Sequence, residues 1–133
     1  MPALVWFKRD LRLTDHAAFN AARQAAPDQP LRGLYIAEPG LWALPDAAAQ
    51  HWAFVRESLL DLGVALRSVG GALTVATGEA TAVLERHWQA QPFDTLLSHE
   101  ETGNDFTFQR DIAVARWCRE RGVRWQEWPQ FGV

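Results

Sequence analysis

The chain has 133 residues, 48 % of them hydrophobic, which is enough for one compact domain and excludes a disordered segment. Its formal net charge of −3 excludes a domain that binds nucleic acid through its overall charge. The single cysteine, Cys118, excludes an intrachain disulfide and a cysteine-based zinc centre, and it suits a reducing, cytoplasmic location.

The first part of the chain predicts two strands around one helix. Residues 3–7 are a short apolar run that ends in charge, which is typical of a strand buried on both faces. We expect Asp15 to cap a helix over residues 16–26. Residues 31–37 predict the second strand, and the Glu-Pro-Gly sequence at 38–40 is expected to end it.

The middle of the chain predicts two helices and two further strands. Asp46 is expected to open a long helix with its apolar residues on one side, and the two glycines at 70–71 are expected to end it. Residues 72–76 predict a third strand, residues 79–89 a helix, and residues 94–98 a fourth strand.

The last part of the chain predicts one more helix and a fifth strand. Asn104 or Asp105 is expected to cap the helix, whose acidic start and basic end match the helix dipole. Gly122 ends this helix, and residues 123–128 predict the strand. Such alternation predicts a five-stranded parallel α/β sheet with helices on both faces. Ligands of these sheets bind beyond the carboxyl ends of the strands.

Charged residues gather where the first predicted strand ends. One interpretation is an ion-pair cluster that fixes the turn, because arginine forks pair well with carboxylates. The other is a set of ligand contacts. Within this group we expect Asp10 to be structural, in ion pairs with its neighbours Lys8, Arg9 and Arg12.

Motifs for several common kinds of site are missing. The patterns GxGxxG and GxxxxGK[ST] do not occur, so no glycine cradle for a dinucleotide or a nucleoside triphosphate is predicted. The four histidines lack the spacing of metal ligands, and we predict no metal site. After the fourth strand, Glu100 and Glu101 either bind donors of a ligand or form a solvated loop edge.

The segment VWFKRDLRLTDHAAF, residues 5–19, resembles the opening signature of the DNA photolyase/cryptochrome family. His16 replaces an asparagine of that signature, and Phe19 replaces a leucine. Three later segments resemble the family in the same order, namely residues 34–42, 70–84 and 101–114. The resemblance implies that residues 1–133 are the family's N-terminal domain, a Rossmann-like three-layer α/β/α fold that holds a light-harvesting antenna chromophore.

The resemblance also implies a function for a longer parent protein, an FAD-dependent deoxyribodipyrimidine photolyase. Such an enzyme repairs UV-induced pyrimidine dimers in DNA with blue light, and its helical FAD-binding domain would be absent from this chain. We therefore expect no catalytic residue here and no activity from the chain alone. Alternatives are the antenna domain of a signalling cryptochrome and a stand-alone nucleotide-binding α/β module.

Cofactor-binding positions follow from the same resemblance. Family members with a deazaflavin or flavin antenna use the positions of Arg9, His51 and Glu101 and the backbone at Ile36, Ala37 and Glu38. Folate-binding members place a histidine three residues after a tryptophan, here Trp42, and Pro45 stands in its place. We therefore expect 8-hydroxy-5-deazaflavin or FMN rather than methenyl-folate. An empty site is the alternative, because His51 stands where arginine is common. FAD is expected only in the full-length protein.

The expected partners are the missing helical domain, which would pack on this one, and damaged DNA through the full-length protein. Trp125, Trp128 and Phe131 predict an apolar patch through which the chain self-associates. No segment approaches the ~20 apolar residues of a membrane span, and the N-terminus lacks a signal peptide, so we expect no membrane contact.

Overall fold

The computed structural model describes residues 2–42 and 51–129, which contain five strands and five helices. The strands are β1 (Ala3–Phe7), β2 (Arg32–Ala37), β3 (Ala72–Thr77), β4 (Thr95–His99) and β5 (Arg124–Trp128). The helices are α1 (Ala17–Ala25), α2 (Pro39–Trp42), α3 (His51–Ser68), α4 (Ala80–Ala90) and α5 (Asp105–Arg121). None of the helices in these ranges is both long enough and apolar enough to cross a membrane.

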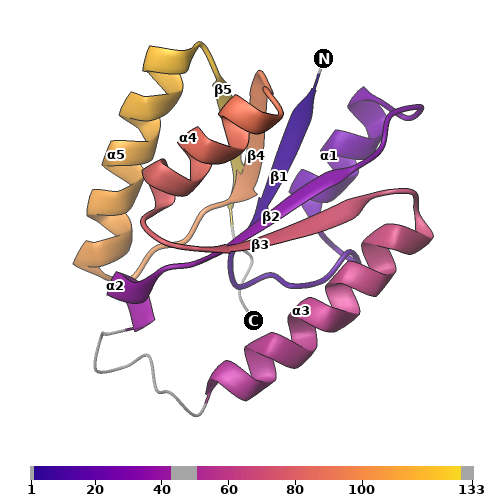
Figure 1. Cartoon of the computed structure of the whole chain (residues 1–133), viewed down its shortest axis with the longest axis horizontal. Helices are drawn as coiled ribbons and strands as arrows, with labels where there is room; N and C mark the ends of the chain where they lie inside the picture. Colours follow the sequence, from indigo (N-terminus) through magenta and orange to yellow (C-terminus); the bar gives the residue numbers. More distant parts are fainter. Residues whose placement is uncertain (1, 43–50, 130–133) are drawn as a thin grey trace.

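All five strands run parallel in one sheet with the order β3-β2-β1-β4-β5 (Figure 1). β1 therefore lies at the centre, where Val5 pairs with Gly33 of β2 on one side and with Leu97 of β4 on the other. This arrangement confirms the predicted five-stranded parallel α/β sheet. The chain extends the sheet from β1 to β3 and then returns to place β4 beside β1. Sheets of this kind bind ligands at such a change of direction.

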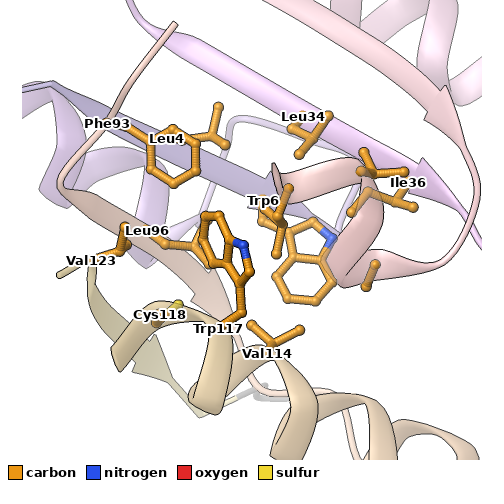
Figure 2. Packing of buried hydrophobic residues seen from close by; sticks show 13 residues of the cluster. Leu4, Trp6, Leu34, Ile36, Phe93, Leu96, Val114, Trp117, Cys118 and Val123 are labelled. Atoms are coloured by element: carbon orange, nitrogen blue, oxygen red, sulfur yellow. The ribbon is translucent and has the colours of Figure 1, made fainter. Parts of the chain in front are cut away.

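Helices α4 and α5 cover one face of the sheet and enclose the larger apolar core (Figure 2). Leu4 and Trp6 of β1 belong to this core, together with Leu96 of β4 and with Val114 and Trp117 of α5. Trp6 is 1 % exposed, so its large ring is a central contact between the sheet and α5.

Helices α1 and α3 cover the opposite face. Val5 and Phe7 of β1 pack there with Phe19 of α1 and with Leu62 and Leu66 of α3. Successive residues of a strand point to opposite faces, so a strand buried on both sides is apolar throughout, as residues 3–7 are. The helices on both faces confirm the three-layer α/β/α fold.

The cap of α1 differs from the expectation. Asp15 does not cap α1, because it lies in the left-handed region at φ 51°. His16 is the N-cap instead, and its Nδ1 atom accepts the backbone N–H of Phe19 at 2.9 Å. The second strand ends at Ala37, directly before Glu38-Pro39-Gly40, as expected, and Pro39 begins the short helix α2, since the first turn of a helix needs no N–H from proline. The expected helix start at Asp46 lies outside the described residues.

The predicted apolar patch at the C-terminal end is smaller than expected among the described residues. Trp125 is half-buried against the core under α4 and α5, and Trp128 is half-buried against the core under α1 and α3. Phe131 lies outside the described residues. The two tryptophans therefore serve the fold of this domain in the first place.

Candidate functional site

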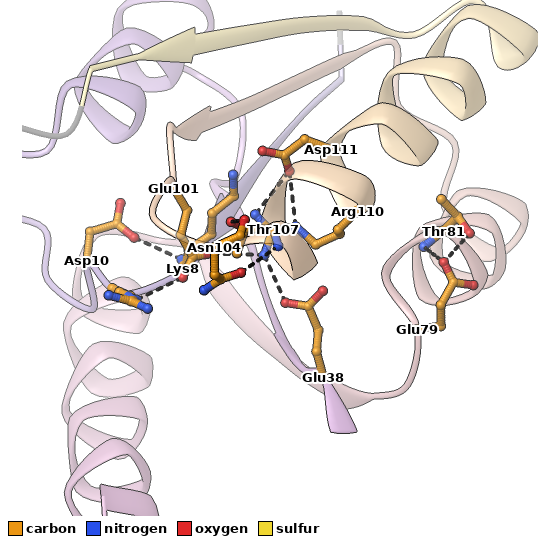
Figure 3. Close-up of polar contacts among 11 residues, drawn as sticks. Lys8, Asp10, Glu38, Glu79, Thr81, Glu101, Asn104, Thr107, Arg110 and Asp111 are labelled. Atoms are coloured by element: carbon orange, nitrogen blue, oxygen red, sulfur yellow. Dashed lines mark hydrogen bonds and ion pairs between the residues drawn. The ribbon is translucent and has the colours of Figure 1, made fainter. Parts of the chain in front are cut away.

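Charged side chains from four parts of the chain converge at the carboxyl edge of the sheet (Figure 3). Lys8 and Arg9 follow β1, Glu38 follows β2, Glu101 follows β4, and Arg110 lies on the inner face of α5. Parallel strands end at the same edge of a sheet, so residues distant in sequence meet here.

Arg110 joins the two carboxylates. Its Nη1 atom donates to Glu38 Oε2 at 3.0 Å and to Glu101 Oε1 at 2.8 Å. Its Nε atom donates to Asp111 Oδ1 at 3.0 Å, and Arg9 Nε donates to Glu101 Oε2 at 2.9 Å. We call these five residues the Arg110 network. The side chains of Glu38, Glu101 and Arg110 are at most 6 % exposed, and buried charges of this kind need such pairing.

Glu38 is only partly satisfied by hydrogen bonds within the Arg110 network. Its Oε1 atom is buried without a hydrogen-bond partner among the described residues. Burial raises the pKa of Glu38 to about 7, although the charge and hydrogen bond of Arg110 act in the opposite direction. Burial, followed by the charges of Glu101 and Glu38, also raises the pKa of Tyr35 to about 12. Glu38 can therefore take up or release a proton near neutral pH.

Lys8 lies between two tryptophans. Its Nζ atom is 4.3 Å from the ring centroid of Trp6 and 5.7 Å from that of Trp125, and it has no hydrogen-bond partner among the described residues. Contact with aromatic faces partly compensates its charge. Burial lowers the pKa of Lys8, and the positive charge of Arg110 lowers it further. The guanidinium of Arg110 is itself 5.0 Å from the Trp6 ring, so this ring faces two cations.

Asp10 is structural as predicted, but its expected partners are wrong. Its carboxylate accepts the backbone N–H of Lys8 at 2.8 Å and a hydrogen bond from His99 Nδ1 at 2.7 Å, and His16 Nε2 lies 2.5 Å from its Oδ2 atom as an ion-pair contact. In place of an ion pair with Asp10, Arg9 binds Glu101, and Arg12 donates from Nε to Thr14 O. Burial alone would raise the pKa of Asp10, but the hydrogen bond from His16 leads the effects that hold it far below its usual range.

Asp10, His16 and His99 offer three ligand atoms within 4.8 Å of one another, a spacing that a metal ion could bridge. The hydrogen bonds argue against this use. Since His16 Nδ1 accepts the N–H of Phe19, the ring hydrogen lies on Nε2, the atom that a metal would need. A metal-bound histidine instead donates through its second nitrogen. We therefore interpret these residues as a structural cluster that ties the turn after β1 to α1 and β4.

The structure brings together three of the six predicted cofactor-binding residues. Arg9, Glu38 and Glu101 meet through Arg110. Ile36 and Ala37 end β2, and their side chains are buried in separate apolar clusters, so backbone atoms are what they can offer a ligand. The side chain of His51 lies outside the described part of the structure.

Sequence reasoning missed Arg110 and His16. Arg110 lies at helical spacing between the buried residues Thr107, Val114 and Trp117, and a charge within a buried stripe predicts a buried partner. His16 stands where the family signature has asparagine, and both side chains can accept a helix N-cap hydrogen bond.

Two surface hollows lie apart from this edge. One of about 590 Å³ lies between the ends of α1 and α3, beside Arg23 and Pro27. One of about 360 Å³ lies between β3 and α4, beside Thr74 and Arg86. No member of the Arg110 network lines either hollow, and within the network the Arg9 side chain is 68 % exposed at the edge of the sheet.

A family model described as DNA photolyase matches residues 3–130. The chain belongs to the DNA photolyase family. Within this photolyase family it is similar to Cryptochrome-2 of Gallus gallus, with 35 % identity over 118 residues. It is also similar to the deoxyribodipyrimidine photo-lyase of Agrobacterium fabrum, with 39 % identity over 125 residues. These matches cover 89 % and 92 % of this chain but 20 % and 24 % of the relatives, so the chain spans less than a quarter of their length.

The photolyase N-terminal fold is also found in solved structures. An archaeal photolyase from Sulfolobus tokodaii matches with a TM-score of 0.81 and 28 % identity, over 97 % of this chain and 29 % of that one. That protein was solved with two FAD molecules, which implied a novel light-harvesting cofactor. The five-stranded sheet described above is therefore the N-terminal α/β domain of the photolyase family.

Proposed function

We propose that this chain is the antenna domain of an FAD-dependent deoxyribodipyrimidine photolyase, in which a separate helical domain repairs pyrimidine dimers with blue light. The 39 % identity to the Agrobacterium enzyme supports the photolyase assignment, and the short span of the match supports a single domain of a longer protein. A bound antenna chromophore would absorb light and pass the excitation energy to FAD in the helical domain. The chain alone would then lack repair activity.

The observation that carries this proposal is the convergence of Arg9, Glu38 and Glu101 through Arg110 at the carboxyl edge of the sheet. The resemblance to the family implies that flavin or deazaflavin antennae are held at Arg9, at the backbone of Glu38 and at Glu101, which supports the proposal. The exposed guanidinium of Arg9 uses its Nε atom for Glu101, so its outer nitrogens can donate to a ligand. The two FAD molecules of the Sulfolobus protein support a flavin-type antenna. We therefore favour 8-hydroxy-5-deazaflavin or FMN.

A second candidate is the antenna domain of a signalling cryptochrome, favoured by the 35 % identity to Cryptochrome-2 of Gallus gallus. The two candidates share the antenna and differ in what the rest of the protein does. Repair of thymine dimers in irradiated DNA, measured with the full-length parent under blue light, separates them. Repair supports the photolyase, and loss of repair with retained flavin photoreduction supports the cryptochrome.

The antenna site is tested by titrating the purified chain with FMN and following quenching of flavin fluorescence. Wild type should bind, and Arg9→Ala should weaken binding about tenfold, because a charge-assisted hydrogen bond is lost. The melting temperature should hardly change, since an ion pair formed by an exposed arginine contributes little to stability. Arg116→Ala, which removes an exposed arginine on α5, is the matched control. Failure of wild type to bind either FMN or deazaflavin would contradict the antenna proposal.

A further inference from the structure

The two carboxylates of the Arg110 network differ in how many hydrogen bonds they accept. Both oxygens of Glu101 are used, Oε1 by Arg110 and Oε2 by Arg9. Glu38 uses Oε2 for Arg110, and its Oε1 atom has no partner in the described part of the chain. A proton on Glu101 would therefore displace an arginine, whereas a proton on Glu38 Oε1 breaks no described hydrogen bond.

The charges around this edge contain no excess of cations before any ligand arrives. The cations are Lys8, Arg9 and Arg110, and the anions are Glu38, Glu101, Asp111 and Glu127, whose charge acts on Lys8 and Arg110. The unused hydrogen-bonding capacity nevertheless consists mostly of donors, because Lys8 Nζ and the outer nitrogens of Arg9 are free of described partners. Such a surface suits an anion, but an added anion increases the excess of negative charge. Protonation of one carboxylate reduces that excess.

We propose that this site binds its ligand as an anion together with one proton, and that Glu38 Oε1 carries the proton. The inference rests on the proposed antenna function and adds the charge of the ligand and its linkage to pH. The anion would be the phosphate of FMN or the ionised hydroxyl of a hydroxy-deazaflavin, held at the rim by Arg9. Glu38 need not touch the ligand, because its charge acts through the network.

The groups that face Glu38 are consistent with this role. Arg110 from α5 favours its ionised form, and Lys8 after β1 acts in the same direction. Glu101 after β4 opposes ionisation, and burial opposes it more strongly, so the pKa of Glu38 is about 7. Tyr35 of β2 stays neutral in this range, because its own pKa is raised to about 12. Glu38 is thus the carboxyl group that should take up a proton from solvent when an anion binds nearby at near-neutral pH.

The test compares FMN with riboflavin, which has the same ring system without the phosphate. Binding of each to wild type is measured at about pH 7 and about pH 8.5 at constant ionic strength. If binding requires the protonated acid, the Kd of FMN should rise about fifteen-fold over this range. The Kd of riboflavin should change little. Calorimetry of wild type in two buffers of different ionisation enthalpy should show net proton uptake with FMN.

Glu38→Gln should flatten the pH dependence of FMN binding, and Glu100→Gln, which alters an exposed neighbouring carboxylate, should retain it. An FMN affinity that is independent of pH, or a Glu38→Gln profile equal to that of wild type, would overturn the linkage and leave the antenna proposal standing. If wild type takes up no proton when it binds FMN, this result would also overturn the linkage and leave the antenna proposal standing. Failure of wild type to bind both flavins would overturn both proposals.

Discussion

Replacement of Asp10 by alanine should remove the acceptor that holds the first turn of the sheet. The Lys8 backbone N–H and His99 Nδ1 donate to its carboxylate, and His16 Nε2 makes an ion-pair contact with it. Asp10 is 1 % exposed, and water cannot replace the lost acceptor without opening the core. Removal of one side of a buried, charged hydrogen-bonded group costs about 3–5 kcal/mol. We expect the free energy of unfolding to fall by about this amount.

Such a loss is large but should leave the protein folded. Domains of this size have roughly 0.05–0.15 kcal/mol of stability per residue, or about 7–20 kcal/mol in all. Urea unfolding followed by tryptophan fluorescence and circular dichroism measures the difference directly. The melting temperature should fall by roughly 10–20 °C. Asp28→Ala, which removes an exposed carboxylate, should stay within about 0.5 kcal/mol of wild type.

A second variant separates the cap of α1 from the Asp10 contact. His16→Asn keeps an acceptor for the N–H of Phe19, since asparagine is a favoured N-cap, but it loses the imidazole donor to Asp10. It should cost less than Asp10→Ala, about 1–2 kcal/mol. A loss below about 1 kcal/mol for Asp10→Ala, or a larger loss for Arg12→Ala, would refute this reasoning.

Two further changes test the packing of α2 and the burial of Glu38. Gly40→Ala should lower the free energy of unfolding in urea by about 1–3 kcal/mol, because the new Cβ would lie 2.5 Å from the Phe106 ring. Gly63→Ala is the control, since its Cβ would meet no atom within 4 Å and should not destabilise the protein. Equal losses of stability in the two variants would contradict this view. The folded pKa of Glu38, about 7, lies above its usual 4.5, so its contribution to stability is present below about pH 4.5 and is lost as pH rises through 7. The free energy of unfolding of wild type should therefore fall by up to about 3 kcal/mol between about pH 5 and pH 8, and that of Glu38→Gln should fall clearly less. An equal dependence of stability on pH in the two proteins would count against this burial effect.

The elements of the fold were predictable because burial leaves a local pattern. Residues 3–7 face two cores, so they form an uninterrupted apolar run, and the one-sided stripe of α3 predicts a helix on a single face. The helix at Pro39 was not predictable from the Glu-Pro-Gly sequence, which suits a turn as well. Its position depends on the packing of Gly40 against Phe106 of α5, a contact between distant parts of the chain.

The location of the candidate site could be predicted from the sequence, but the contacts between its side chains could not. The parallel sheet indicated that the site lies where the strands end, and the resemblance to the family indicated Arg9, Glu38 and Glu101 as its residues. The partner of each charge was not predictable, since Lys8, Arg9 and Arg12 are all near Asp10 in sequence. In the folded chain two histidines reach Asp10 instead. Neighbouring charges on a strand end point in different directions, so tertiary packing decides the pairing.

The central place of β1 has a consequence for how the protein folds during synthesis. β1 is synthesised before the other strands and can pair with β2 early. Its other edge pairs with β4, for example Val5 with Leu97, so this edge stays unpaired until β4 has left the ribosome. Pairings between distant residues form slowly, and an open strand edge is a template for other chains. The most buried strand of the finished domain is thus the one exposed longest to misassembly. The yield of folded protein should depend on how fast residues 95–99 reach it.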